Sequence, residues 1–384
     1  MKVIISTRAI YPFHGNGGME TYYYNLAKHL VREGVETEII SSLTNTVGKT
    51  EYYDDIKYTF LPPNFNKKPL MSLWCRFFDL NVKKYLQRID FDILHATAGI
   101  HPYVLSKNRK KVIFQPFGLE WFKITKGLVK LYTYALNYRT DKLIFNHADA
   151  IASEGKANTQ EIMSLFKVPR EKIFTLPNGV DLSLIEECLA NSEIHQEDYG
   201  IQDADLVLVN VNKLIPHKGV HYLIDALEIL NKNLNAKLIL IGSGSQEQKL
   251  KEQIKRNKLQ DKVIHFKSIP NEKIFAFYAL ADIAVTPTLY EGGCPPFVVL
   301  EAMAVGKPIV TTDIPQMQDA VKDGMNGFLV QPRNPKAISD AILTIYNKGL
   351  IREMGKNSRE IVKEYDWNII AKRAITKYEE LIEE

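Results

Sequence analysis

The sequence predicts an α/β protein with two Rossmann-like, doubly wound domains that face a central cleft. A chain of 384 residues exceeds the size at which one hydrophobic core keeps growing, so two domains are expected. Short apolar runs alternate with helical patterns, which indicates parallel sheets covered by helices. This alternation begins again after a turn-rich segment near the middle of the chain, and the second series therefore predicts a second sheet.

The first domain is predicted over residues 1–185. It opens with an apolar strand, followed by a glycine-rich turn at residues 14–18 and a helix from Met19 to about Arg32. Gly34 ends that helix. The strands expected in this domain cover residues 3–6, 37–40, 93–95, 112–114 and 150–153.

The second domain is predicted over residues 186–365, after a linker near 182–205. Its expected strands cover residues 206–210, 237–241, 263–266, 283–285 and 308–311. Residues 366–384 have the pattern of an amphipathic helix, which we expect to cross back to the first domain.

Composition indicates a soluble globular protein, with 45% hydrophobic and 24% charged residues. No apolar run approaches the length of a membrane span, and the chain opens with a strand, so we expect no signal peptide and a cytoplasmic location. Three scattered cysteines fit a reducing compartment. The histidines lack zinc spacing and no Asp-x-Asp pair follows a strand, so no metal or other cofactor is expected.

Charge is distributed unevenly along the chain. Residues 1–185 carry an excess of Lys and Arg, whereas residues 186–384 carry an excess of Asp and Glu. Residues 67–86 also mix aromatic and basic side chains in a largely helical pattern. A packed helix with solvated lysines explains that segment, and so does contact with an anionic membrane surface. No feature points to nucleic acid.

The most informative stretch is 288–308. Glu291 lies on a Gly/Pro-rich turn after an apolar strand, and Glu301 lies on the early face of the following helix. Two carboxylates held in this way suit a ligand rich in hydroxyl groups, because a carboxylate can accept two hydroxyl hydrogens. An ordinary strand-turn-helix unit with solvated glutamates is the alternative.

Glycine-rich turns and lysines follow other predicted strands. Gly17 and Gly18 lie between the first strand and helix, where backbone amides suit a diphosphate, although a plain tight turn is the alternative. Lys213 and Lys218 follow the first strand of the second domain and can neutralise a leaving diphosphate. The alternative is that both are ordinary surface lysines without a functional role. The remaining candidates in turns are Gly242 and Gly244, for a nucleotide, Ser268, for a base edge, and His101, for a sugar. A plain connection from strand to helix is the alternative for the two glycines, and a structural role is the alternative for His101.

Taken together, these motifs resemble glycosyltransferase family 4, whose members are retaining enzymes with the GT-B fold. The resemblance runs in order along essentially the whole chain, through residues 17–20, 117–121, 177–181, 213–219, 242–244 and 291–304. It implies that Glu291 and the backbone of residues 292–298 hold the donor sugar. That segment is Gly292, Gly293, Cys294, Pro295, Pro296, Phe297 and Val298. It also implies that Glu301 binds the donor ribose, and that Lys213 and Lys218 bind the diphosphate.

Three positions depart from the family pattern. Nine residues rather than seven separate Glu291 from Glu301, so either the loop has an insertion or Gly293 takes the usual position. The basic pair is Lys213 and Lys218 rather than Arg and Lys, which keeps the charge without the bidentate fork. Phe117 stands where many members have a histidine, and it is a candidate contact to the sugar or acceptor.

The resemblance implies a metal-independent, retaining hexosyltransferase that uses a nucleotide-diphospho-sugar and a hydroxyl acceptor. A lipid-linked glycan at the membrane surface is the preferred acceptor, and a soluble sugar or glucan is the alternative. A related GT-B enzyme such as an epimerase and a non-catalytic sugar-nucleotide-binding subunit remain competing hypotheses. The sequence names neither the base nor the sugar of the donor.

Overall fold

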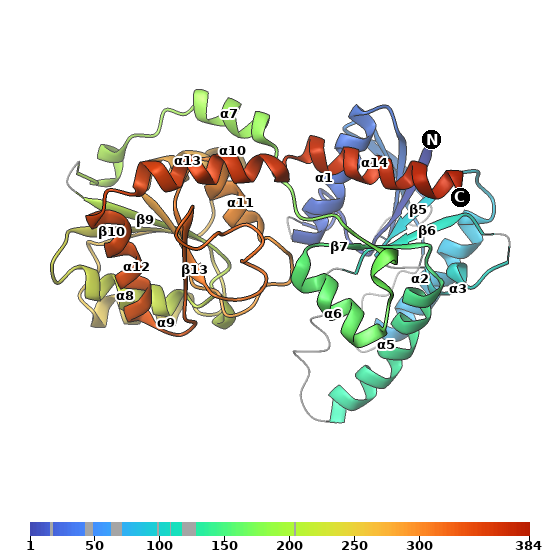
Figure 1. Ribbon diagram of the computed structural model, residues 1–384, viewed down its shortest axis with the longest axis horizontal. Helices are drawn as coiled ribbons and strands as arrows, with labels where there is room; N and C mark the ends of the chain where they lie inside the picture. Colours follow the sequence, from blue (N-terminus) through green and yellow to red (C-terminus); the bar gives the residue numbers. More distant parts are fainter. Residues whose placement is uncertain are drawn as a thin grey trace. The chain divides into compact units, whose positions relative to one another are not determined.

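Two sheets organise the computed structural model, and each belongs to its own unit of the chain (Figure 1). Unit 1 comprises Met1–Pro177 and Trp367–Glu384, and unit 2 comprises Asn178–Asp366. The structure describes residues 1–15, 18–42, 49–62, 71–97, 100–107, 109–116, 128–202 and 205–384.

The sheet of unit 1 has eight strands in the order β3-β4-β2-β1-β5-β6-β7-β8. All neighbouring pairs are parallel except β3 and β4, which form a hairpin. The central strands are buried because both faces of the sheet are covered, which explains their continuous apolar runs. The strands are β1 (Lys2–Ser6), β2 (Glu36–Ser41), β3 (Thr50–Tyr53), β4 (Ile56–Phe60), β5 (Ile93–Ala96), β6 (Lys111–Phe114), β7 (Ala150–Ser153) and β8 (Ile173–Thr175).

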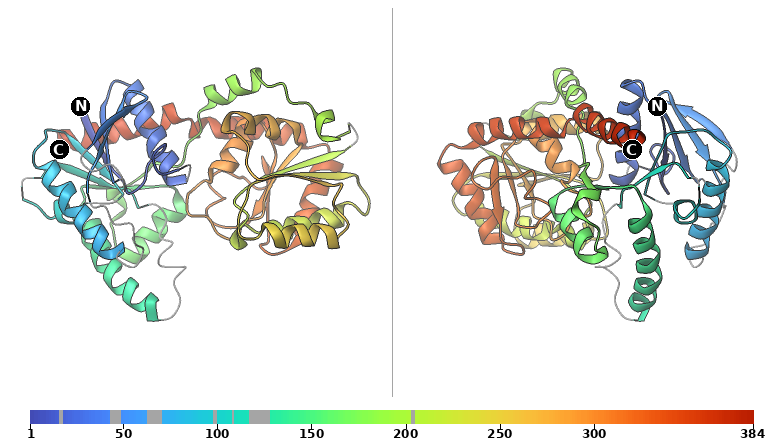
Figure 2. Two further views of the ribbon diagram at one scale, coloured as in Figure 1. Left: turned by 180° about the vertical axis from the view of Figure 1, so that it is seen from behind. Right: turned by 45° about the vertical axis from the view of Figure 1, so that its right-hand side comes forward.

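Helices cover both faces of this sheet. They are α1 (Gly18–Arg32), α2 (Met71–Leu86), α3 (His101–Val104), α5 (Leu128–His147), α6 (Lys156–Phe166) and α14 (Trp367–Glu383). One core joins α2, α3, α5 and α6 to the strands. On the other face α14 packs along α1, as the further views also show (Figure 2).

The C-terminal helix α14 is fixed to unit 1 by aromatic and polar contacts. The ring of Trp367 lies 5.2 Å from that of Tyr22, centroid to centroid. The Tyr378 hydroxyl lies 2.7 Å from Nδ1 of His95, whose Nε2 is 2.9 Å from Oε1 of Gln115. Burial of the imidazole lowers the pKa of His95 to about 4, so it stays neutral in this core. His95 therefore serves the packing of α14.

Unit 2 contains a six-stranded, wholly parallel sheet in the order β11-β10-β9-β12-β13-β14. Its strands are β9 (Leu206–Val211), β10 (Ala236–Ile241), β11 (Val263–Phe266), β12 (Ile283–Thr286), β13 (Ile309–Thr312) and β14 (Gly327–Val330). Strand β9 lies between β10 and β12, so the chain reverses direction across the sheet at this strand. Such a switch point is where doubly wound sheets usually bind ligands.

The helices of unit 2 form two layers around the sheet. They are α7 (Leu182–Ala190), α8 (Val220–Leu230), α9 (Glu247–Arg256), α10 (Asn271–Leu280), α11 (Phe297–Ala304), α12 (Pro335–Asn347) and α13 (Ile351–Val362). One core joins α7, α10 and α11 to the strands, and a second joins α8, α9 and α12 to the opposite face (Figure 1).

The division between the units comes after Pro177, whereas the sequence placed the domain boundary after residue 185. Residues 182–190, expected to begin a linker, form α7 within unit 2. The Asp181 carboxylate accepts a hydrogen bond from the Leu184 amide at 3.0 Å and caps this helix. Ile185 is buried in the core of unit 2, so packing and capping make a helix of the segment.

Candidate functional site

The candidate residues of unit 2 lie in loops at the carboxyl edge of its sheet. The loop after β9 carries Lys213 and Lys218, the loop after β10 carries Gly242 and Gly244, and the loop after β12 carries Glu291. Because the three strands are neighbours and parallel, their loops meet at one edge. The topology therefore brings together residues that are far apart in sequence.

Glycines allow these loops to pack backbone to backbone. A Cβ atom on Gly242 would lie 1.8 Å from the carbonyl oxygen of Asn212, and one on Gly244 would lie 2.4 Å from that of Leu214. Gly219 has a φ of +67°, and a Cβ there would lie 2.0 Å from the carbonyl oxygen of Pro287. These glycines are thus required for close approach of adjacent loops. This packing role of the glycines differs from the nucleotide contact predicted for Gly242 and Gly244, and the same glycines can do both.

The loop after β10 also offers backbone donors. Its outer ends are tied to the loop after β9, since the Leu214 amide donates to the Ser243 carbonyl at 2.9 Å and the Gln246 amide to the Leu214 carbonyl at 2.8 Å. Among the residues that the structure describes, none accepts a hydrogen bond from the amides of Ser243, Gly244 or Ser245. Three successive amides just before α9 suit a phosphate or another anion.

Lys218 and Glu291 form an ion pair. The ammonium Nζ of Lys218 lies 2.6 Å from both Oε1 and Oε2 of Glu291. Their side chains are only 15% and 8% exposed, so the pair is largely shielded from water. Lys213, in contrast, is exposed. The structure therefore joins two predicted site residues directly and leaves the third near them in the same loop.

Side-chain contacts hold the glycine- and proline-rich loop of residues 291–296 at Pro295 and Cys294. The Asn178 side-chain amide donates to the Pro295 carbonyl at 2.7 Å. The same amide nitrogen would lie 2.6 Å from a Cβ atom on Gly293, so a side chain there would displace it. The buried Cys294 thiol lies 3.5 Å from Oδ2 of Asp319. The nine residues between Glu291 and Glu301 comprise the rest of this loop and the first four residues of α11.

The predicted donor residues from Gly292 to Val298 extend from this loop into α11. Gly292 lies near the start of the anchored loop, Pro296 stands at the N-cap position of α11, and Phe297 and Val298 are the first two residues of the helix. The first backbone N–H groups of a helix have no partner within it. The amino end of α11 therefore points donors into the same group of loops.

Glu301 lies on α11 with its side chain partly exposed. The hydroxyl of Tyr278, on α10, lies 3.3 Å from its Oε2 and 3.1 Å from the Val298 carbonyl oxygen, and these two acceptors share the one hydroxyl hydrogen. Burial raises the pKa of Glu301 to about 7, and the hydrogen bond from Tyr278 opposes that rise. This carboxyl group consequently changes charge near neutral pH.

The other predicted residues are more scattered. Ser268 is exposed in the loop after β11, whose last residue, Phe266, accepts a hydrogen bond from the Gly242 amide at 2.8 Å. In unit 1, Gly18 is the first residue of α1, and His101 is the first residue of α3, after β5. Gly17 and Phe117 lie outside the described residues.

Asn178, Tyr278 and Asp319 were not predicted as site residues. Asn178 lies in the segment 177–181, which contributes to the family resemblance without a role for this residue, and no pattern marks Tyr278 within its helix. In the parts of the chain that the structure describes, no group of three or more His, Cys, Asp or Glu side chains is arranged to hold a metal ion. Nor does any described helix combine the length and apolar character needed to cross a membrane.

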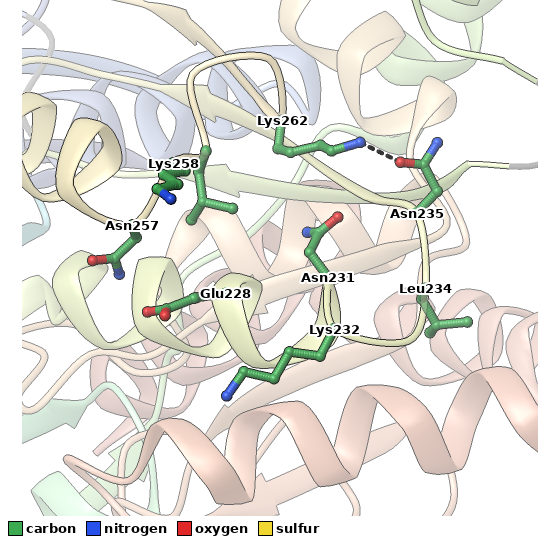
Figure 3. Close-up of a pocket in the computed structure, with 9 residues that line it drawn as sticks. Glu228, Asn231, Lys232, Leu234, Asn235, Asn257, Lys258 and Lys262 are labelled. Atoms are coloured by element: carbon green, nitrogen blue, oxygen red, sulfur yellow. Dashed lines mark hydrogen bonds between the residues drawn. The ribbon is translucent and has the colours of Figure 1, made fainter.

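A separate pocket lies at the opposite edge of the same sheet (Figure 3). Leu234, Asn235 and Lys262 line it just before β10 and β11 begin, together with residues at the ends of α8 and α9. The ammonium of Lys262 donates to the side-chain carbonyl of Asn235. Since doubly wound sheets bind ligands at the carboxyl ends of their strands, this pocket is distinct from the candidate site.

Family models match both halves of the chain. Residues 16–184 match the model described as Glycosyltransferase Family 4, and residues 191–362 match the model described as Glycosyl transferases group 1. An uncharacterized glycosyltransferase of Methanocaldococcus jannaschii is 27% identical, with 98% of each chain covered. A phosphatidyl-myo-inositol mannosyltransferase of Mycobacterium leprae is 24% identical, covering 96% of this chain and 94% of its own.

Solved structures share the fold of the whole chain. The sucrose-phosphate synthase of Thermosynechococcus elongatus superposes with a TM-score of 0.80 at 19% identity, covering 99% of this chain and 98% of its own. Anabaena HepE in complex with UDP-glucose superposes with a TM-score of 0.73 at 19% identity, covering 99% of this chain and all of its own.

Proposed function

Because the chain belongs to glycosyltransferase family 4 and has the GT-B fold, we propose that it is a retaining hexosyltransferase that works without a metal ion. Its donor is a nucleotide-diphospho-sugar bound at the carboxyl edge of the unit 2 sheet, and its acceptor is a hydroxyl group. The observation that carries the proposal is the convergence there of two lysines, a row of open amides and two glutamates.

Charge development explains why these residue types suit sugar transfer. As the bond between the anomeric carbon and the phosphate oxygen breaks, negative charge grows on the departing diphosphate. Fixed positive groups aimed at that position stabilise the transition state more than the ground state. Lys213, Lys218 and the amides of residues 243–245 supply such groups. They take the part that a metal ion plays in other transferases.

The two glutamates suit the hydroxyl-bearing ends of the donor. Glu301, ionised, accepts hydrogen bonds from the two ribose hydroxyls, and Glu291 accepts them from the sugar. The Tyr278 hydroxyl holds the Glu301 side chain close to the first turn of α11, so the carboxylate is oriented before the ligand arrives. Retention follows from attack by the acceptor on the face that the diphosphate leaves, where a phosphate oxygen takes the acceptor proton.

The acceptor we propose is a lipid-linked glycan at the cytoplasmic face of a membrane. Helices α2, α3 and α5 pack side by side on one face of unit 1. Exposed apolar and basic side chains on and directly after these helices form what we call the basic-apolar surface: Phe77, Leu80, Lys84, Leu105, Lys107, Lys142 and Leu143. Apolar side chains flanked by lysines are suited to an anionic bilayer surface.

Calorimetric binding of nucleotide-sugars tests the donor site. The panel begins with UDP-glucose, the ligand of the Anabaena neighbour, and continues with GDP-mannose and ADP-glucose, each in the presence of EDTA. We expect one donor to bind, and Lys218→Ala to weaken it by about tenfold or more through the loss of a charge-assisted contact. Lys336→Ala is the matched control, because Lys336 pairs with Asp340 on an exposed helix.

Several outcomes would contradict this proposal. If the wild-type chain binds no nucleotide-sugar, the donor site is not what we propose. Binding that EDTA abolishes would contradict metal independence, and a product of inverted anomeric configuration, seen by NMR, would contradict retention. Conversion of the donor without any acceptor would favour an epimerase.

Vesicle sedimentation tests the membrane contact. We expect the chain to bind vesicles rich in phosphatidylglycerol, to bind neutral phosphatidylcholine vesicles less, and to be released by high salt because salt screens surface charge. Leu80→Ser should weaken vesicle binding, whereas Leu184→Ser, which alters an equally exposed leucine on α7, should not. Equal loss in both variants, or no vesicle binding by the wild type, would contradict the lipid acceptor.

A further inference from the structure

The bidentate contact between Lys218 and Glu291 has a consequence for which ligands the proposed donor site prefers. Both oxygens of the carboxylate lie 2.6 Å from the ammonium, and both side chains are largely buried. A charge pair so shielded from water interacts more strongly than an exposed one. Any ligand group that also uses this ammonium must therefore share it with Glu291.

Backbone and side-chain ties hold the two partners in place. The Leu289 amide donates to the His217 carbonyl at 2.7 Å, and the Thr288 hydroxyl, whose hydrogen is shared with the Tyr290 carbonyl at 2.8 Å, lies 3.2 Å from the same His217 oxygen. These bonds join the turn that carries Lys218 to the loop that carries Glu291, close to each partner in sequence. The backbone segments that carry the two charges are therefore held close to each other.

A nucleoside diphosphate and a nucleotide-sugar meet this pair differently. The diphosphate is attracted to Lys218 but repelled by the adjacent carboxylate, because like charges brought together raise the free energy of binding. A nucleotide-sugar also brings hydroxyl hydrogens, which Glu291 accepts and which offset that repulsion. The same residue thus opposes one ligand and favours the other.

We propose that Glu291 is a specificity-determining residue that makes the donor site prefer the nucleotide-sugar over the corresponding nucleoside diphosphate. This inference rests on the proposed function. It adds that the diphosphate product, once its sugar has been transferred, must share the Lys218 ammonium with the Glu291 carboxylate and brings no sugar hydroxyls to that carboxylate, which promotes its release. Lys213, exposed in the same loop, attracts either ligand without this discrimination.

The test compares the affinities of paired ligands by calorimetry: UDP with UDP-glucose, and GDP with GDP-mannose. In Glu291→Gln the side chain keeps its shape but loses its charge. We expect the nucleoside diphosphate to bind this variant on the order of tenfold more tightly than it binds wild type, since a like charge is removed. We expect the nucleotide-sugar to gain less or to lose affinity, so the preference for the sugar falls.

Two further variants sharpen the test. Glu360→Gln removes the same charge from an exposed helix of unit 2, where Glu360 pairs with Lys363, and should leave both affinities unchanged. In Lys218→Met/Glu291→Gln, the diphosphate should bind more weakly than to Glu291→Gln, because the released ammonium is no longer there. Circular dichroism confirms that each variant is folded.

The failure of this inference differs from failure of the proposed function. If wild type binds a nucleotide-sugar but Glu291→Gln leaves the ratio of the two affinities unchanged, Glu291 does not discriminate and the donor site still stands. A diphosphate that binds more weakly to Glu291→Gln would likewise overturn the inference. If wild type binds neither ligand of either pair and does not bind ADP-glucose, the proposed function itself is wrong.

Discussion

Replacement of Glu301 by glutamine tests whether the ionised carboxylate of Glu301, in the proposed nucleotide site, lowers the stability of the folded chain. Glutamine keeps the size of the side chain and can still accept the hydrogen bond from Tyr278. It removes only the negative charge. The change therefore isolates the effect of placing a carboxylate where α10 and α11 shield it from water.

The expected magnitude follows from the pKa. Burial raises the pKa of Glu301 from 4.5 to about 7, so the folded chain binds this proton more tightly than the unfolded chain. The contribution of Glu301 to the free energy of unfolding of wild type is therefore fully present below pH 4.5 and is lost as the pH rises toward 7. The upper bound on the loss is about 3 kcal/mol, and because the side chain is partly exposed we expect about 1–2 kcal/mol.

Urea unfolding at pH 5, 6, 7 and 8, followed by circular dichroism, measures this effect. The stability of Glu301→Gln relative to wild type should grow by that amount between pH 5 and pH 8. All three tryptophans fall in the sequence ranges of unit 1: Trp74, Trp121 and Trp367. Their fluorescence therefore follows the unfolding of unit 1, which serves as an internal reference for the change made in unit 2.

Glu360→Gln provides the control for the pH dependence. Lys363 lowers the pKa of Glu360, so removing that carboxylate should produce no gain as the pH rises. A stability difference between Glu301→Gln and wild type that stays constant from pH 5 to pH 8 would refute the assignment of a raised pKa to Glu301.

Two other predictions concern the same unit. Nucleotide binding near pH 7 should release a proton from Glu301, because ribose hydroxyls favour its ionised form; calorimetry in buffers of different ionisation enthalpy measures the release, which Glu301→Gln should abolish. Gly242→Ala should destabilise unit 2 by about 1–3 kcal/mol more than Gly324→Ala. Both glycines have positive φ, but a Cβ atom at Gly242 meets the Asn212 carbonyl whereas one at Gly324 meets nothing within 4 Å; equal losses in urea unfolding would refute the backbone contact.

The strand-and-helix alternation was predictable from sequence because its signals are local. Buried parallel strands need continuous apolar runs, and five such runs in each half coincide with strands of the two sheets. The ends of these runs locate the loops, so the apolar pattern alone assigns Lys218, Gly242 and Glu291 to loops, where the fold places them. The GT-B fold that the resemblance implied is confirmed.

Elements with weak local signals escaped prediction. The β3–β4 hairpin turns at Asp54 and Asp55, both with positive φ, where an Asn-Gly pair would have marked the turn. Strand β14, Gly327–Val330, is short and lies at the edge of its sheet. Helix α7 lies in a segment that we predicted as a linker, and it is stabilised by packing against unit 2.

Sequence alone determined which residue types occupy the loops of the candidate site and in what order. Only the tertiary structure decided which of these residues are in contact. Lys218 and Glu291 are 73 positions apart, and Asn178 and Pro295 are 117 apart. The contact between Lys218 and Glu291 depends on the pairing of β9 with β12, because parallel neighbours bring their carboxyl ends to one edge, whereas Asn178 reaches Pro295 from the segment before α7. Strand order and loop paths are properties of the whole packed sheet, and no local pattern of residues specifies them.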